Sequence, residues 1–209
     1  IDVSKQAEHD QKKWLFTWNK NMFNESGGGS NVSLWRVPYE GILGCNLVLD
    51  YLDEMYGEEE IKESLRGEAL TLRAWYYLHM VNMWGIAYNQ GDPRTNPGVP
   101  LKLTAVLKPD YIPRNTVAEV YSRMESDLLE GNRLLTENDF DRNYFRMNHL
   151  AAKSILSRVY LYMEEWDKSI AYADSVLQLK PDLVNLNDFD RETSLSRIHI
   201  SEPTRPRLR

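Results

Sequence analysis

Apolar residues recur every three to four positions along most of this chain, and this spacing restricts its fold more than any other feature. The spacing places apolar side chains on one face of an α-helix, whereas a half-buried strand alternates apolar and polar residues. No segment shows that alternation. The sequence therefore predicts an all-α fold, with helices over 3–23, about 39–56, about 58–84, from 117 onward, through 152–163 and over 168–179.

The segments between these helices differ in character. A Gly/Ser/Asn-rich stretch at 24–38 predicts a loop. Residues 85–115 contain five prolines and predict a long connection, which is unusual unless it is functional or packed against the body. Thr116 and Glu119 have the spacing of a capping box, so a helix is expected to follow directly. Asp167 is expected to cap the last helix.

The last two predicted helices carry the residue types of a tetratricopeptide unit. The unit has large, small and aromatic positions in its first helix, then a turn position, a close-packing position and a terminating proline. These positions are filled by Leu156, Ser157, Tyr160, Trp166, Ser169 and Pro181. Lys153 and Val176 depart from the usual residues of the repeat. An ordinary antiparallel helix pair is the alternative interpretation.

Composition bounds the class of protein. The 209 residues contain 42% hydrophobic and 27% charged residues, which suits one soluble domain or one half of a larger protein. The net charge of −6 provides no basic surface for a phosphate backbone, which argues against nucleic-acid binding. Cys45 is the single cysteine, so an intrachain disulfide and a cysteine-based zinc site are both excluded. We expect it to be a small buried apolar residue.

The last twenty residues, 190–209, differ from the rest of the chain. They hold five arginines, three acidic residues and no lysine, and they lack a usable periodicity. One interpretation is a basic tail that binds a partner. The other is sequence not native to the fold, such as a frame change or translated adapter sequence. Residues 1–189 are therefore predicted to form the folded region.

Catalytic, metal and cofactor signatures are missing from the sequence. The four histidines are scattered without the i, i+4 pairing of a zinc hydrolase. The three glycines at 27–29 lack the lysine and the preceding strand of a phosphate loop. The acidic run at 139–143 lacks the glycine and the glutamate that a calcium loop needs. A hydrolase is accordingly the least favoured function, and we predict no catalytic residue, metal site or cofactor.

Three segments resemble the SusD/RagB family. Residues 67–77 end in Arg-Ala-Trp-Tyr-Tyr and lead to Met-Trp-Gly at 83–85 and to Val-Pro-Leu at 99–101. Residues 113–121 read Pro-Arg-Asn-Thr-Val-Ala-Glu-Val-Tyr, similar to the opening of the family's next helix. Residues 151–162 are similar to a further family helix that contains Arg-Val-Tyr-Leu. The order and spacing match across 1–189.

The resemblance implies a superhelical scaffold of four tetratricopeptide-like hairpins. It implies a binding protein without enzymatic activity that is held by lipid at the surface of the outer membrane. Such proteins cap a TonB-dependent transporter of the SusC type and capture oligosaccharide, or peptide in RagB-like members, for nutrient uptake. Family members are usually more than twice this long, so the chain is expected to hold the N-terminal part. The lipid-bearing cysteine is expected upstream of Ile1.

Ligand contacts are predicted in the segment 24–38. Oligosaccharides are bound by flat aromatic faces together with amides and guanidinium groups held on a rigid scaffold. Asn31, Trp35 and Arg36 supply these three chemistries within six positions. The alternative for Trp35 is that its ring merely packs over the next helix. The competing function is a tetratricopeptide adaptor that binds only protein, and an upstream lipid-attachment motif would favour the importer.

Overall fold

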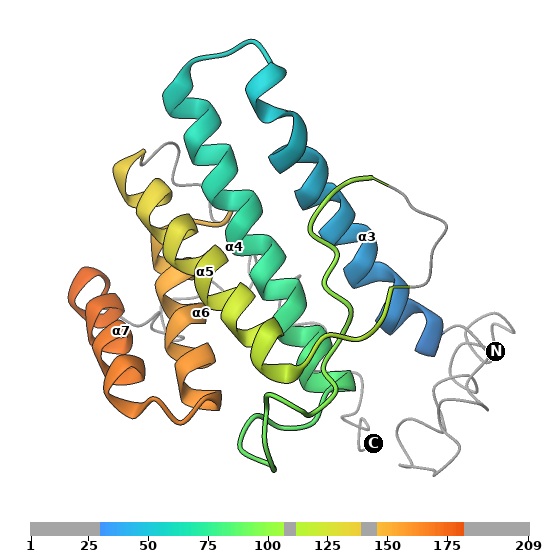
Figure 1. Cartoon of the computed structure of the whole chain (residues 1–209). Helices are drawn as coiled ribbons and strands as arrows, with labels where there is room; N and C mark the ends of the chain where they lie inside the picture. Colours follow the sequence, from blue (N-terminus) through green and yellow to red (C-terminus); the bar gives the residue numbers. More distant parts are fainter. Residues whose placement is uncertain (1–29, 107–111, 139–145, 182–209) are drawn as a thin grey trace, which may run out of the picture.

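The computed structural model describes residues 30–106, 112–138 and 146–181 (Figure 1). Within these ranges each helix packs mainly against the next one along the chain. The described residues contain no strand, and one isolated antiparallel bridge joins Pro97 and Thr116. The prediction of an all-α, tetratricopeptide-like fold is confirmed. The elements are α3 (Ser30–Tyr51), the short 3-10 helix η1 (Leu52–Glu54), α4 (Glu59–Trp84), α5 (Val117–Glu137), α6 (His149–Tyr162) and α7 (Trp166–Leu179).

The predicted loop at 24–38 is wrong from Ser30 onward, because α3 begins there and contains Pro38. A proline inside a helix removes one backbone hydrogen bond and costs about 3 kcal/mol. Tertiary contacts stabilise this turn in compensation. The Trp35 ring packs on Trp84 of α4, and the Tyr39 hydroxyl donates to the Pro100 carbonyl at 2.7 Å. The proline and the preceding glycines signal a break locally, but the packing of α3 on α4 decides the outcome.

Other helix ends were predicted with mixed success. The capping box is confirmed, because the Thr116 hydroxyl accepts from the Glu119 amide and the Glu119 carboxylate accepts from the Thr116 amide. The N-cap of α7 is Glu165 and not Asp167, which already lies in the first turn. The α3 helix ends at Tyr51 and continues as η1. The helix predicted over 3–23, the acidic run at 139–143 and the tail at 190–209 lie outside the described residues.

Two glycines let α4 and α5 approach each other closely. A side chain at Gly131 would lie 2.5 Å from the Thr71 hydroxyl and 3.0 Å from the Gly67 carbonyl. A side chain at Gly67 would meet Leu135 at 2.9 Å. Buried apolar residues of α4, α5 and α6 form the core around this crossing, with Tyr77, Met80, Met124, Leu128, Leu156 and Val159 among the most deeply buried.

The described part of the long connection before residue 107 packs along α3 and α4 (Figure 1). The Tyr77 hydroxyl donates to the Lys102 carbonyl at 2.8 Å and accepts from the Lys102 amide at 2.7 Å. The Asn46 amide donates to the same carbonyl at 2.9 Å, and the Asp50 carboxylate accepts from the Ala105 amide at 2.7 Å. Side chains of two helices therefore form hydrogen bonds with backbone groups of Lys102 and Ala105 in this connection.

Small residues hold α6 and α7 together, as the tetratricopeptide pattern predicts. The Ser157 hydroxyl donates to the Ser169 carbonyl, and the Ser169 hydroxyl donates to the Ser157 carbonyl, both at 2.9 Å. The Tyr160 and Tyr172 rings stack beside this contact with centroids 5.6 Å apart. Glu164, in the turn between the helices, has a φ of 62°, in the left-handed region that few non-glycine residues adopt. This turn forms one side of the cavity described next.

Candidate functional site

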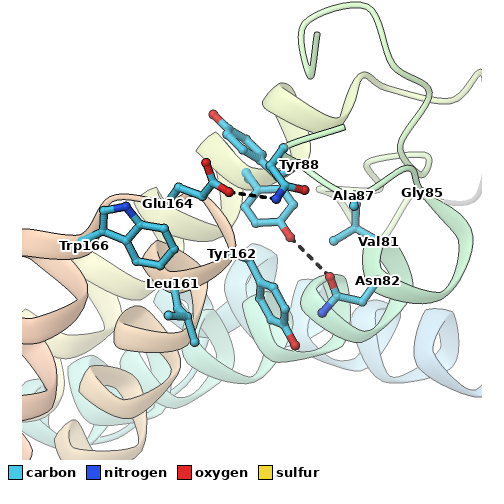
Figure 2. A pocket seen from close by; sticks show the side chains of 11 residues that line it. Val81, Asn82, Gly85, Ala87, Tyr88, Leu161, Tyr162, Glu164 and Trp166 are labelled. Atoms are coloured by element: carbon cyan, nitrogen blue, oxygen red, sulfur yellow. Dashed lines mark hydrogen bonds between the residues drawn. The ribbon is translucent and has the colours of Figure 1, made fainter. Parts of the chain in front are cut away.

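A cavity of about 430 Å³ lies where the C-terminal end of α4 meets α5 and the turn between α6 and α7. The segment that follows α4 completes its wall. Figure 2 shows Trp166 and Leu161 on one side of the space, with Val81 and Asn82 facing them from α4. The lining residues are Val81, Asn82, Gly85, Ala87, Tyr88, Asn89, Tyr121, Leu161, Tyr162, Glu164 and Trp166.

Aromatic rings form much of this cavity. Tyr121 is buried, and the Tyr88 ring leans against it with centroids 4.8 Å apart. Tyr162 and Trp166 are open to solvent, and Trp166 is 54% exposed. Two buried or half-buried rings thus support a concave surface that two accessible rings complete. Such rings offer flat, rigid apolar faces at a low cost in conformational entropy.

Polar groups are placed among these rings. The Asn89 side-chain amide donates to the Glu164 carboxylate at 2.8 Å, and the Tyr121 hydroxyl donates to the Asn82 side-chain oxygen at 3.3 Å (Figure 2). Burial raises the pKa of Tyr121, and the neighbouring Tyr162 adds to this effect, so its phenol stays protonated as a donor. The site combines amide, carboxylate and phenol groups with apolar faces, which suits a ligand carrying both hydroxyl groups and C–H faces.

Glu164 has a left-handed backbone conformation, and its carboxylate accepts a hydrogen bond from Asn89. A conformation of this kind costs about 1–3 kcal/mol for a residue with a side chain, and it persists only where the surroundings hold it. The hydrogen bond from Asn89 joins the α6–α7 turn to the segment after α4, 75 positions earlier in the chain. Glu164 therefore links two sides of the cavity.

The predicted ligand residue Trp35 lies on a separate surface. The residue is 37% exposed, and its ring contacts Trp84 edge-on, with centroids 5.5 Å apart, and Tyr39 at 5.2 Å. Trp35 thus packs over the neighbouring helix and also keeps an open edge, and its role as a ligand contact stays a prediction. Sequence reasoning did not select Trp84, although its aromatic-Gly position was part of the motif. Burial raises the pKa of Tyr39, which remains a hydrogen-bond donor.

The other two predicted ligand residues are not brought to this surface by any described contact. The Arg36 guanidinium pairs with the Glu40 carboxylate at 2.9 Å on the exposed side of α3. Asn31 belongs to α3, but its side chain lies outside the part of the structure that is described. The grouping of Asn31, Trp35 and Arg36 therefore stays a prediction.

Comparison with known proteins places the chain in a family. The SusD-like family described as starch-binding and associating with the outer membrane matches residues 2–161. The chain belongs to the SusD-like family. No curated protein matches it significantly.

Solved structures of SusD-like proteins share its fold. A SusD-like carbohydrate binding protein of Bacteroides vulgatus is 29% identical with a TM-score of 0.68, over 78% of this chain and 34% of its own. A SusD superfamily protein of Bacteroides fragilis is 30% identical with a TM-score of 0.62, over 75% and 37%. A laminarin binding SusD-like protein is 26% identical with a TM-score of 0.57, over 69% and 29%. The chain spans about a third of the length of these structures.

In this SusD-like chain, residues of all three motif segments line the cavity, namely Gly85, Tyr121, Leu161 and Tyr162, and a further motif residue, Arg114, supports it from behind. Arg114 donates from Nε to the Gly98 carbonyl at 2.6 Å and from its terminal nitrogen to the Trp84 carbonyl at 2.5 Å. Since Trp84 is the last residue of α4 and Gly85 lines the cavity, Arg114 holds the helix end from which the cavity wall begins. Among the described residues, no helix is long and apolar enough to span a bilayer.

Proposed function

We propose that this chain is the saccharide-binding part of an outer-membrane nutrient-capture protein, and that the cavity between α4, α5 and the α6–α7 turn holds a sugar ring. The observation that carries the proposal is the set of four aromatic rings around one hollow, interleaved with two amides. Relatives named for binding carbohydrate and laminarin support this ligand class.

The proposal includes the cellular setting. Surface exposure, a lipid anchor upstream of this chain and cooperation with a SusC-type TonB-dependent transporter are proposed on family grounds. The family description supports association with the outer membrane. A saccharide bound at a rigid helical scaffold is then passed to a transporter for import.

Binding without catalysis fits the cavity. Hydrolysis of a glycosidic bond generally needs two carboxyl groups that flank the bond. The described lining residues provide one, Glu164, which is already hydrogen-bonded to Asn89. We therefore propose that the chain retains saccharide and does not cleave it.

The predicted surface around Trp35 is proposed as an outer contact region for the same ligand. Trp35 contacts Trp84, and Trp84 precedes Gly85 of the cavity wall, so the two regions meet at the end of α4. Asn31 and Arg36 belong to this proposal by their proximity to Trp35 in the sequence.

Glycan-array binding followed by calorimetry tests the proposed function. The 209-residue chain is probed with oligosaccharides and with unstructured peptides, and the strongest ligand is titrated into the wild type and into Trp166→Ala. We expect saccharide binding that Trp166→Ala weakens several-fold, because a stacked ring contributes about 0.5–1.5 kcal/mol. Binding of peptides alone would replace the saccharide proposal with a RagB-like one.

A second candidate function is protein binding through the outer face of α7. Ile170, Leu177 and Leu179 leave more than half of their surface exposed there, and Ser169 is the buried residue of this helix. Tetratricopeptide hairpins bury such faces against a further hairpin or a partner. Ile170→Glu with Leu177→Glu, made in the full-length protein, tests whether transporter co-purification depends on this face while saccharide affinity stays unchanged.

A further inference from the structure

The charged group in the cavity lining is negative. Among the described residues that line it there is one carboxylate, that of Glu164, and there is neither lysine nor arginine. The turn that carries Glu164 continues with two exposed acidic residues, Glu165 and Asp167. The ammonium group of Lys168 follows, but it lies 3.7 Å from the Glu165 carboxylate and 5.1 Å from the centre of the Tyr160 ring. The Lys168 ammonium group therefore contacts Glu165 and Tyr160, and Lys168 is not among the lining residues of the cavity.

The hydrogen-bonding capacity of Glu164 also favours an uncharged ligand over an anionic one. An ionised carboxylate only accepts hydrogen bonds. One oxygen of Glu164 accepts from Asn89, and the described residues provide no donor for the other oxygen. An uncharged saccharide presents hydroxyl donors that suit this oxygen. A carboxylate or sulfate on a saccharide presents acceptors and a like charge instead.

Electrostatic repulsion sets how much more weakly an anionic saccharide binds than an uncharged one. Two like charges 4 Å apart repel by about 1 kcal/mol in water and by a larger value at the lower effective dielectric near a protein surface. The lower value alone weakens binding about fivefold. An anionic group entering this cavity has no lining cation to offset that cost.

We infer that this cavity selects uncharged oligosaccharides and rejects uronate-containing and sulfated ones, with Glu164 as the selecting residue. The inference rests on the proposed function, because it assumes that the cavity binds saccharide. The aromatic rings supply affinity for the sugar face. The carboxylate on the α6–α7 turn adds a hydrogen bond for neutral hydroxyl groups and a penalty for anions.

A binding comparison on the 209-residue chain tests the inference. The array carries neutral oligosaccharides, including maltohexaose and laminarihexaose, and acidic ones, including hexagalacturonate and a sulfated oligosaccharide. Glu164→Gln removes the charge while keeping an oxygen that accepts from Asn89. The control is Glu58→Gln, which removes the same charge at the other end of α4, about 40 Å away for a helix of 26 residues.

We expect the wild type to bind neutral saccharides at least about fivefold more tightly than acidic ones of equal length. Glu164→Gln should narrow this ratio severalfold, and Glu58→Gln should leave it unchanged. Salt should also narrow the ratio in the wild type, because exposed charges are screened. The proposed selection would be overturned if acidic saccharides bound as tightly as neutral ones, or if Glu58→Gln changed the ratio as much as Glu164→Gln. Either result would still establish that the chain binds saccharide. Absence of any saccharide binding would overturn the proposed function as well.

Discussion

Arg73 on α4 and Asp127 on α5 form a bidentate ion pair in the interior, with both nitrogen–oxygen distances at 2.8 Å. The side chains are 3% and 1% exposed. Arg73 also donates to the Asn46 side-chain oxygen at 2.8 Å, and the Asn46 amide donates to the Lys102 carbonyl. One guanidinium group therefore connects α3, α4, α5 and the long connection. Arg73 itself belongs to the motif segment 67–77 on α4.

Removal of the Asp127 carboxylate should destabilise the protein strongly. In Asp127→Ala the Arg73 charge stays buried without its partner, and an orphaned buried charge typically costs about 3–5 kcal/mol. The matched control is Glu130→Ala on the same helix, whose pair with Arg133 is exposed and is worth about 0–1 kcal/mol. Urea unfolding measures both. If the two substitutions cost the same, the buried pair does not stabilise the fold.

Replacement of the whole pair should be tolerated far better than removal of one partner. Arg73→Met with Asp127→Leu places apolar groups of similar volume in the same space, which is often neutral for buried ion pairs. The expected urea midpoint lies well above that of Asp127→Ala. A double variant as unstable as the single one would assign the stability to the partners that remain, Asn46 beside Arg73 and Arg123 beside Asp127.

The glycine crossing of α4 and α5 gives a second test of packing. Gly131→Ala places a methyl group 2.5 Å from the Thr71 hydroxyl and 3.0 Å from the Gly67 backbone, so we expect a loss of about 1–3 kcal/mol. Gly44→Ala in α3 meets no atom within 4 Å and should gain about 0.5–1 kcal/mol from helix propensity. Thermal unfolding of the two variants should shift in opposite directions. Equal shifts would mean that the helices separate to accept the methyl group.

The sequence predicts the helices better than the surfaces on which they meet. The positions of α4 and of the start of α5 follow from periodicity and from the Thr116 capping box, which are local signals. The start of α3 was missed because Pro38 and the preceding glycines signal a loop, whereas the contact between Trp35 and Trp84 holds the segment as helix. That contact joins residues 49 positions apart, and a single sequence does not reveal it.

The cavity was missed for the same physical reason. Its lining comes from four segments, and periodicity shows which face of a helix is apolar without showing which distant faces meet. Tyr121 and Trp166 were assigned to helix and turn positions of known patterns, which hid their common location. The local signal that was available is Tyr88 followed by Asn89 directly after a helix, an aromatic ring and an amide at the entrance to the connection.

The thiol of Cys45 should make stability fall in alkaline solution. Burial raises its pKa from 9.0 to about 11, and Asp127 adds to this shift while Arg73 opposes it. Between these values the folded state keeps the proton that the unfolded state loses. Since the folded state then binds more protons, its stability decreases as pH rises from 9 to 11. Below pH 9 the thiol is protonated in both states and has no effect.

Unfolding of the wild type and of Cys45→Ala over pH 8–11 measures this contribution. The variant loses some packing at every pH, so the quantity to compare is the slope of stability between pH 9 and 11, which should be shallower in Cys45→Ala. Iodoacetamide should label Cys45 slowly in the folded protein at pH 8.5 and rapidly in urea. Equal labelling rates in the two states would show that the thiol is accessible, contrary to its buried position.

Trp35→Ala decides whether the predicted outer surface contacts ligand. Because Trp35 is 37% exposed and its ring makes two ring contacts, we expect a stability loss of about 1–3 kcal/mol, below the 3–5 kcal/mol typical of a fully buried tryptophan. If its open edge meets saccharide, affinity should also fall severalfold, the size of one stacked ring. Calorimetry at a temperature where the variant is folded separates the two effects. A loss of stability with unchanged affinity would assign Trp35 to packing alone, and Asn31 and Arg36 would lose their support as ligand contacts.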